Sequence, residues 1–208
     1  MFKLISPNML KTYEHCPLKF YFKYAENVSM PVNDEIFEFG KNIHALASYF
    51  LRGEYIDKME KSLSSKEFDV WSYLKNLKYF GYKVINTEYT LTVKIGEFFF
   101  TGRLDALVKD GPRYYILDYK TGSAPKDAKY DYQTMIYLLA VKEFFQTENV
   151  TFIYLDLKNK DEVRIDYSKE IEKEYTVKLT NIASKLNQTD KPVKKKSECK
   201  CEYSIICV

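Results

Sequence analysis

The sequence predicts a mixed α/β domain in which a central sheet is flanked by helices. Two observations support this class. Apolar residues recur at helical spacing in the first part of the chain, and from residue 89 they alternate with polar residues as strands require. Helix-like and strand-like segments then alternate to about residue 186. The 208 residues are enough for one domain with its own hydrophobic core.

The composition excludes several classes of protein. Hydrophobic residues make up 46% and charged residues 29%, so long disorder is not expected. No segment reaches the roughly 18 consecutive apolar residues of a membrane span, and no secretion signal begins the chain, so we expect a cytoplasmic protein without a membrane. The net charge of +3 is too small to indicate a nucleic-acid partner by itself.

The N-terminal part is expected to be helical. Ser6 and Pro7 have the order of an N-cap and a first-turn proline, so a short helix should begin there, and the Cys-Pro pair at 16–17 should interrupt it. Apolar residues at helical spacing predict longer helices over 35–52 and 66–80.

The middle of the chain predicts three antiparallel strands. Strand patterns cover 89–95, 98–108 and 113–120, and turns at Gly96 and Gly111 separate them. We therefore expect an antiparallel meander.

The remaining elements are a helix, two strands and a second helix. A long helix is expected over 127–146, a strand over 150–157 and its hairpin partner over 162–167. An amphipathic helix should follow over 169–186, before a polar, basic tail that ends in cysteines.

Two acidic residues lie in neighbouring strands of the meander. Asp105 and Asp118 are about equally far from the turn at Gly111, so they can meet across the ladder. Two close carboxylates repel each other unless a proton or a cation lies between them, and hard oxygen ligands suit Mg²⁺ or Mn²⁺. Lys120 shares a strand face with Asp118 and could hold a water or stabilise a phosphate. The alternative is an ordinary ion pair at a strand end.

His44 is one of only two histidines, and it lies one helical turn after Gly40. An imidazole that joined the two carboxylates would complete a metal site, and Mn²⁺ accepts histidine better than Mg²⁺ does. A satisfied core or surface histidine is the alternative.

The four cysteines are Cys16, Cys199, Cys201 and Cys207. Cytosolic proteins seldom carry disulfides, whereas four thiolates suffice for one Zn²⁺ or one iron–sulfur cluster. They could also be unrelated small apolar residues.

Several motifs occur in a fixed order along nearly the whole chain: Gly40-x3-His44, Gly102-Arg103-x-Asp105, Asp118-Tyr119-Lys120-Thr121-Gly122 and Gln133-x3-Tyr137. This set resembles the RecB-like branch of the PD-(D/E)XK nuclease superfamily. The opening Cys16-Pro17 and the closing Cys201-x5-Cys207 resemble its iron–sulfur members, which include CRISPR-adaptation nucleases and AddB-type helicase–nuclease domains.

The resemblance implies a restriction-endonuclease-like core and a role for each motif. The metal, Mg²⁺ or Mn²⁺, would be bound by His44, Asp105, Asp118 and the backbone carbonyl of Tyr119. Asp105, Asp118 and Lys120 would be catalytic, and Gln133 and Tyr137 would contact DNA or position the lysine. Glu88 is a weaker candidate, since an exposed strand glutamate explains it better.

The resemblance further implies one nuclease domain over 1–208, with a helical part (1–80), a core (81–167) and a C-terminal helix and cysteine tail (168–208). The four cysteines would hold a structural [4Fe–4S] cluster. The family spaces its last cysteines as C-x2-C-x5-C, whereas a single residue separates Cys199 from Cys201 here. Zn²⁺, or a labile cluster, is therefore the alternative.

The implied function is metal-dependent hydrolysis of DNA phosphodiesters. The substrate would be single-stranded DNA or DNA ends, and the enzyme would be an exonuclease that works with partner proteins in CRISPR adaptation or recombination. A non-catalytic DNA-binding or assembly subunit and a restriction-type endonuclease are the alternatives. The lysine-rich stretch at 191–200 could follow phosphates or be a solvated linker.

Overall fold

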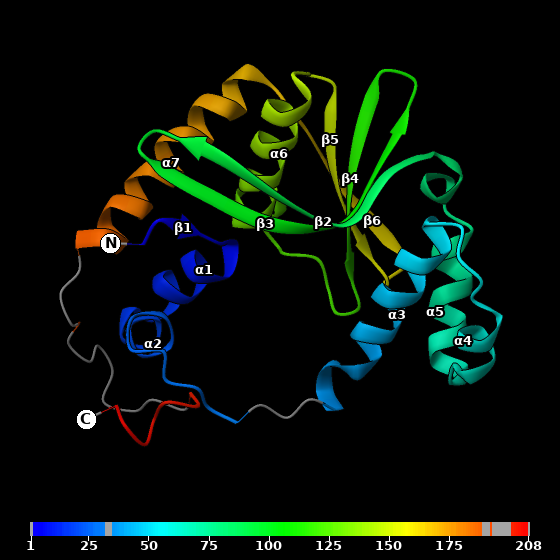
Figure 1. Cartoon of the computed structure of the whole chain (residues 1–208), viewed down its shortest axis with the longest axis horizontal. Coiled ribbons are helices and arrows are strands. Elements are labelled where there is room, and N and C mark those ends of the chain that lie inside the picture. Colours follow the sequence, from blue (N-terminus) through cyan, green and yellow to red (C-terminus); the bar gives the residue numbers. More distant parts are fainter. Residues whose placement is uncertain (1, 32–34, 189–191, 193–200, 208) are drawn as a thin grey trace.

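The computed structural model describes residues 2–31, 35–188, 192 and 201–207. A mixed sheet lies between two layers of helices (Figure 1), which confirms the predicted α/β class. The helices α6 and α7 lie on one side of the sheet, and α3 and α5 lie on the other.

The strands of the described residues are β1 (Leu4–Ile5), β2 (Lys83–Ile95), β3 (Phe98–Asp110), β4 (Arg113–Lys120), β5 (Val150–Asp156) and β6 (Asp161–Asp166). Strands β2, β3 and β4 form the predicted antiparallel meander. Strand β5 then runs parallel to β4, and β6 pairs antiparallel with β5. The crossover from β4 to β5 contains α6, as parallel neighbours require.

The helices are α1 (Pro7–His15), α2 (Pro17–Phe20), α3 (Glu35–Leu51), α4 (Asp57–Ser62), α5 (Ser65–Lys75), α6 (Tyr132–Phe145) and α7 (Lys169–Gln188). A π-helical turn (Tyr21–Ala25) and two 3₁₀ turns (Lys78–Gly81 and Ala128–Tyr130) supplement them. One apolar core lies between the sheet and α1, α6 and α7, and a second lies between the sheet and α3 and α5.

Several element bounds differ from the predicted ones for local reasons. Strand β2 begins at Lys83, six residues before the predicted start at 89. A bulge between Val84 and Asn86 interrupts the apolar–polar alternation, so the sequence pattern did not reveal the first part of this strand. Helix α6 begins at Tyr132 rather than at 127, because the Asp131 side chain accepts a hydrogen bond from Gln133 N and caps the helix. The short elements α4 and β1 were not predicted, since they span too few residues to show a period.

A buried carboxylate anchors the segment that follows β4. Asp156, at the end of β5, accepts hydrogen bonds from Ala124 N at 3.0 Å and Asn159 N at 2.9 Å. Burial raises the pKa of Asp156, but these hydrogen bonds to the ionised carboxylate lower it by more, so the pKa lies below its usual value. The chain just beyond Lys120 is thereby fixed next to the sheet.

Candidate metal centre and active site

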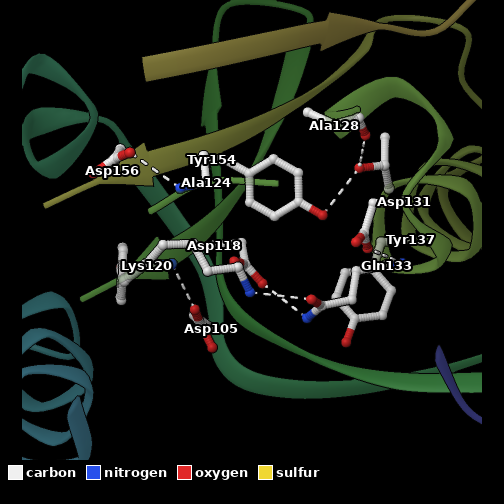
Figure 2. Close-up of polar contacts among 12 residues, drawn as sticks. Asp105, Asp118, Lys120, Ala124, Ala128, Asp131, Gln133, Tyr137, Tyr154 and Asp156 are labelled. Atoms are coloured by element: carbon white, nitrogen blue, oxygen red, sulfur yellow. Dashed lines mark hydrogen bonds and ion pairs between the residues drawn. The ribbon is translucent and has the colours of Figure 1, made fainter. Parts of the chain in front are cut away.

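The two meander carboxylates lie at one end of the β3–β4 ladder. Ala106 pairs with Leu117, so Asp105 and Asp118 are the next residues outward on their strands. The Asp105 carboxylate accepts a hydrogen bond from Tyr119 N at 2.7 Å (Figure 2). The strand register thus brings the two acids together.

Asp118 is only 3% exposed and is held by two neighbours. Its Oδ2 lies 2.7 Å from Lys120 Nζ, and its Oδ1 accepts a hydrogen bond from Gln133 Nε2 at 3.0 Å. Burial, and then the charge of Asp105, raise the pKa of Asp118 to about 7, while Lys120 opposes this rise. A dication beside the two carboxylates would remove the repulsion that disfavours the ionised pair.

His44 reaches the same end of the ladder from α3. Its Nδ1 lies 3.2 Å from Asp105 Oδ1, and its Nε2 lies 3.0 Å from the Tyr119 carbonyl oxygen. Desolvation lowers the pKa of His44, but the hydrogen bond and charge of Asp105 raise it more, so the net pKa lies above its usual value. Both neighbours are acceptors, so the imidazolium form fits this arrangement without a metal.

Glu88 joins this site, although the sequence interpretation favoured an exposed strand residue. His44, Glu88 and Asp105 each offer one ligand atom, and these three atoms lie within 4.8 Å of one another. Among the described residues, they form a cluster of His, Cys, Asp or Glu side chains that could hold a metal ion. Thr87 and Tyr89 pair with Ala106 and Leu104, which places Glu88 opposite Asp105.

The backbone of Glu88 is unusual for a strand residue. Its φ of 50° lies in the left-handed region, and its carboxylate pairs with Arg103 Nε at 3.0 Å. Such conformations are uncommon outside glycine and are concentrated at functional sites. The sequence carried no signal for this geometry, because the bulge upstream depends on the pairing of β2 with β3.

The donor set fits a hard divalent cation. Carboxylates and a backbone carbonyl are the oxygen ligands that Mg²⁺ and Mn²⁺ prefer, and one imidazole favours Mn²⁺. His44, Glu88 and Asp105 can supply three ligand atoms to one position, and the Tyr119 carbonyl oxygen lies 3.0 Å from His44 Nε2. Asp118 is outside the three-residue group and lies against Lys120 and Gln133.

Gln133 organises the lysine side of the site. Its Oε1 accepts hydrogen bonds from Lys120 Nζ at 3.0 Å and from Lys11 Nζ at 3.3 Å, while its amide nitrogen donates to Asp118. Asp131 caps α6 and pairs with Lys11 at 2.7 Å, so the first turn of α6 is tied to α1. The two roles expected for Gln133 were contact with DNA and positioning of Lys120, and these contacts support the second.

Tyr137 lies one turn further along α6 and is 5% exposed. Its hydroxyl donates a hydrogen bond to the Arg103 carbonyl at 3.1 Å, and burial raises its pKa well above the usual value. Its ring packs against Gly102. The structure therefore places Tyr137 as a support of β3 rather than on the surface.

The C-terminal residues 201–207 contact the N-terminal helices. Lys19 Nζ pairs with Glu202 at 2.9 Å, and the Tyr203 hydroxyl donates to the Val28 carbonyl at 2.9 Å. Cys16 Sγ accepts a hydrogen bond from Lys19 N at 3.4 Å. Burial lowers the pKa of Lys19, but Glu202 and, after it, the charge of Cys201 raise that pKa more. Both thiols thus lie near Lys19.

Cys207 is buried. Cys199 and the predicted phosphate-binding lysines (Lys191, Lys194, Lys195, Lys196 and Lys200) lie outside the described residues. In the described part of the chain, no helix is both long and apolar enough to cross a bilayer.

The family model that matches this chain is that of the PD-(D/E)XK nuclease superfamily, over residues 4–208. Among solved structures, the "putative exonuclease" of Eubacterium rectale is similar, with a TM-score of 0.54, 12% identity and coverage of 89% of this chain and 82% of its own. The protein SSO0001 has a TM-score of 0.47 and 17% identity, with coverage of 100% and 86%. No curated protein sequence matches. At these identities the first likeness shows the fold, and the second adds no argument.

Proposed function

The chain belongs to the PD-(D/E)XK nuclease superfamily, and we propose that it is a divalent-metal-dependent deoxyribonuclease that degrades DNA from its ends. The observation that carries this proposal is the convergence of His44, Glu88 and Asp105 within 4.8 Å, beside the Asp118–Lys120 ion pair. A subunit that only bound DNA would not need two mutually repulsive carboxylates, one of them buried, next to a lysine.

Each residue of the site has a distinct part in the proposed hydrolysis. A divalent ion, when bound, polarises a phosphoryl oxygen and lowers the pKa of a water. Asp105, Asp118, His44 and the Tyr119 carbonyl would hold that ion, with Glu88 as a further ligand. The Lys120 ammonium would orient the attacking water or stabilise charge on the phosphate. Gln133 fixes Lys120 and Asp118 relative to each other through its two amide atoms.

Cleavage should require Mg²⁺ or Mn²⁺, and the metal affinity should fall as the pH falls. Asp118 has a pKa raised to about 7, so a metal that requires its carboxylate must displace a proton below that pH. We expect the metal concentration for half-maximal cleavage to rise as the pH is lowered from about 8 to about 6. The midpoint of this rise should lie at about pH 7, the pKa of Asp118.

The proposal is tested by comparing the cleavage of three substrates. These are end-labelled linear DNA, uniformly labelled linear DNA and a closed circular single strand. An exonuclease trims the linear strands and spares the circle. Cleavage in excess EDTA would contradict the metal requirement, and discrete fragments from the circle would favour the endonuclease alternative.

We further propose that Cys16, Cys199, Cys201 and Cys207 hold a [4Fe–4S] cluster that fastens the C-terminal segment to α2. The proximity of both Cys16 and Cys201 to Lys19 supports this proposal. Anaerobically purified protein should contain iron and sulfide with visible charge-transfer absorbance, and Cys201→Ser should lose both. Stoichiometric zinc without iron would contradict the cluster. The expected setting, CRISPR adaptation or recombination, remains a prediction.

A further inference from the structure

One face of α3 lines a groove of about 870 Å³ that contains the metal-binding side chains. Phe37, Lys41, His44 and Tyr49 recur along this face at helical spacing, and Arg52 continues it directly after the end of α3. The opposite face of α3 contributes fully buried residues such as Ile43 and Leu46 to the core against the sheet. The groove-lining face therefore has no packing role that explains its aromatic and basic residues.

The second wall of the groove comes from the strands β2 and β3. Glu88 and Asp105 lie on this wall together with Arg103, whose side chain is 69% exposed. The groove thus combines three cationic side chains with the acidic metal ligands. A bound divalent ion would offset those acids and leave a net positive surface along the groove.

Two aromatic residues of the groove are exposed to solvent. Phe37 is 53% exposed and Tyr49 is 37% exposed. The Arg52 guanidinium lies 4.7 Å from the Tyr49 ring centroid and donates a hydrogen bond to Ser48 Oγ at 3.0 Å, so it is held in place. Its pair with Glu54 is solvent-exposed, and such pairs are weak enough for a phosphate to replace.

We propose that this groove binds single-stranded DNA on both sides of the phosphate that is cut. This inference rests on the proposed nuclease function and specifies its substrate. Exposed aromatic rings stack on bases only where the base faces are unpaired and accessible, and interleaved basic side chains follow the phosphates. In a duplex each base is already stacked on its neighbours.

The position of His44 explains the two-sided binding. Phe37 precedes it by seven residues and Arg52 follows it by eight, which corresponds to about 10 Å and about 12 Å along the helix axis. A strand that lies along α3 would therefore contact Phe37 and Lys41 on one side of the metal ligands, and Tyr49 and Arg52 on the other.

The test measures binding separately from cleavage. Fluorescence anisotropy of labelled oligo-dT of about 15 nucleotides is recorded over a range of salt, with Ca²⁺ in place of Mg²⁺ and the DNA checked on gels for integrity. Phe37→Ala should weaken binding by about tenfold with an unchanged salt dependence, because it removes stacking alone. Arg52→Gln should also weaken binding, and it should reduce the slope of log K against log salt by about 0.7, because one phosphate contact is lost.

Matched variants lie outside the groove. Phe68→Ala removes an aromatic side chain that is 49% exposed on α5, and Arg113→Gln removes an ion-paired arginine at the far end of β4. Both should bind as the unchanged protein does. Equal losses in these controls, unchanged binding by Phe37→Ala and Arg52→Gln, or tighter binding of a duplex than of oligo-dT would overturn the inference. Groove-dependent binding without any cleavage would refute the nuclease proposal and leave only the binding of single-stranded DNA by this groove standing.

Discussion

Asp118→Asn is expected to reduce DNA cleavage by about 10³-fold. The amide keeps the size of the carboxylate but removes the charge that faces Lys120 and the metal position. Loss of one preorganised electrostatic group in an active site typically costs about 10²- to 10³-fold, and loss of the acid should also weaken metal binding.

The stability of this variant should have a characteristic pH dependence. Burial and Asp105 raise the folded-state pKa of Asp118 to about 7, so the folded protein binds a proton more tightly than the unfolded chain does. Stability from this group is therefore lost as the pH rises from about 4 towards 7. Urea unfolding in EDTA should show Asp118→Asn gaining on the unchanged protein over that range, whereas added Mn²⁺ should stabilise the unchanged protein more.

A matched control is available at an exposed ion pair of the same type. Asp166 on β6 pairs with Arg113 at 3.2 Å, and its side chain is 62% exposed. Asp166→Asn should keep full cleavage activity. If Asp118→Asn retained more than about a tenth of the activity, or did not gain stability relative to the unchanged protein between about pH 4 and pH 7 in EDTA, the assignment of this carboxylate would be wrong.

The meander and its two acids could be predicted because the information is local. Alternation fixes which residues share a face, and the turn at Gly111 fixes the register that pairs Ala106 with Leu117. Asp105 and Asp118 then have to lie at the same end of the ladder. Helix periodicity likewise gave α3 and α7 to within a residue or two.

Other parts of the site depend on packing between distant segments, and so could not be read from local patterns. His44 reaches Tyr119 only because α3 lies across the sheet, and nothing near it in the sequence specifies that contact. Glu88 faces the metal position because a bulge and a left-handed backbone turn it there. The resemblance supplied His44 and offered Glu88 only as a weaker candidate, whereas the geometry brings both side chains to the site.

Gly102→Ala is expected to affect both stability and cleavage, although Gly102 bears no chemical group. A Cβ at this position would lie 2.1 Å from Tyr137 Cε1, so the ring would have to move. The ring is 5% exposed and its hydroxyl is bonded to the Arg103 carbonyl, so it has no room to do so. Overpacking of this kind costs about 1–3 kcal/mol. Because Gln133 lies one turn earlier on α6, a shifted Tyr137 should also disturb the Lys120 contact and lower the cleavage rate.

The close approach of Gly102 to the Tyr137 ring can be tested by a compensating change. Tyr137→Leu creates space, so the double variant with Gly102→Ala should be less destabilised in urea than the sum of the single variants. Gly81→Ala is the matched control, because a Cβ there meets nothing within 4 Å, and it should change stability by less than about 0.5 kcal/mol. Additive effects of the two changes would show that Gly102 does not act through Tyr137. Sub-additive effects would explain why the Gly-Arg-x-Asp motif needs a glycine: it lets α6 approach the strand that carries Asp105.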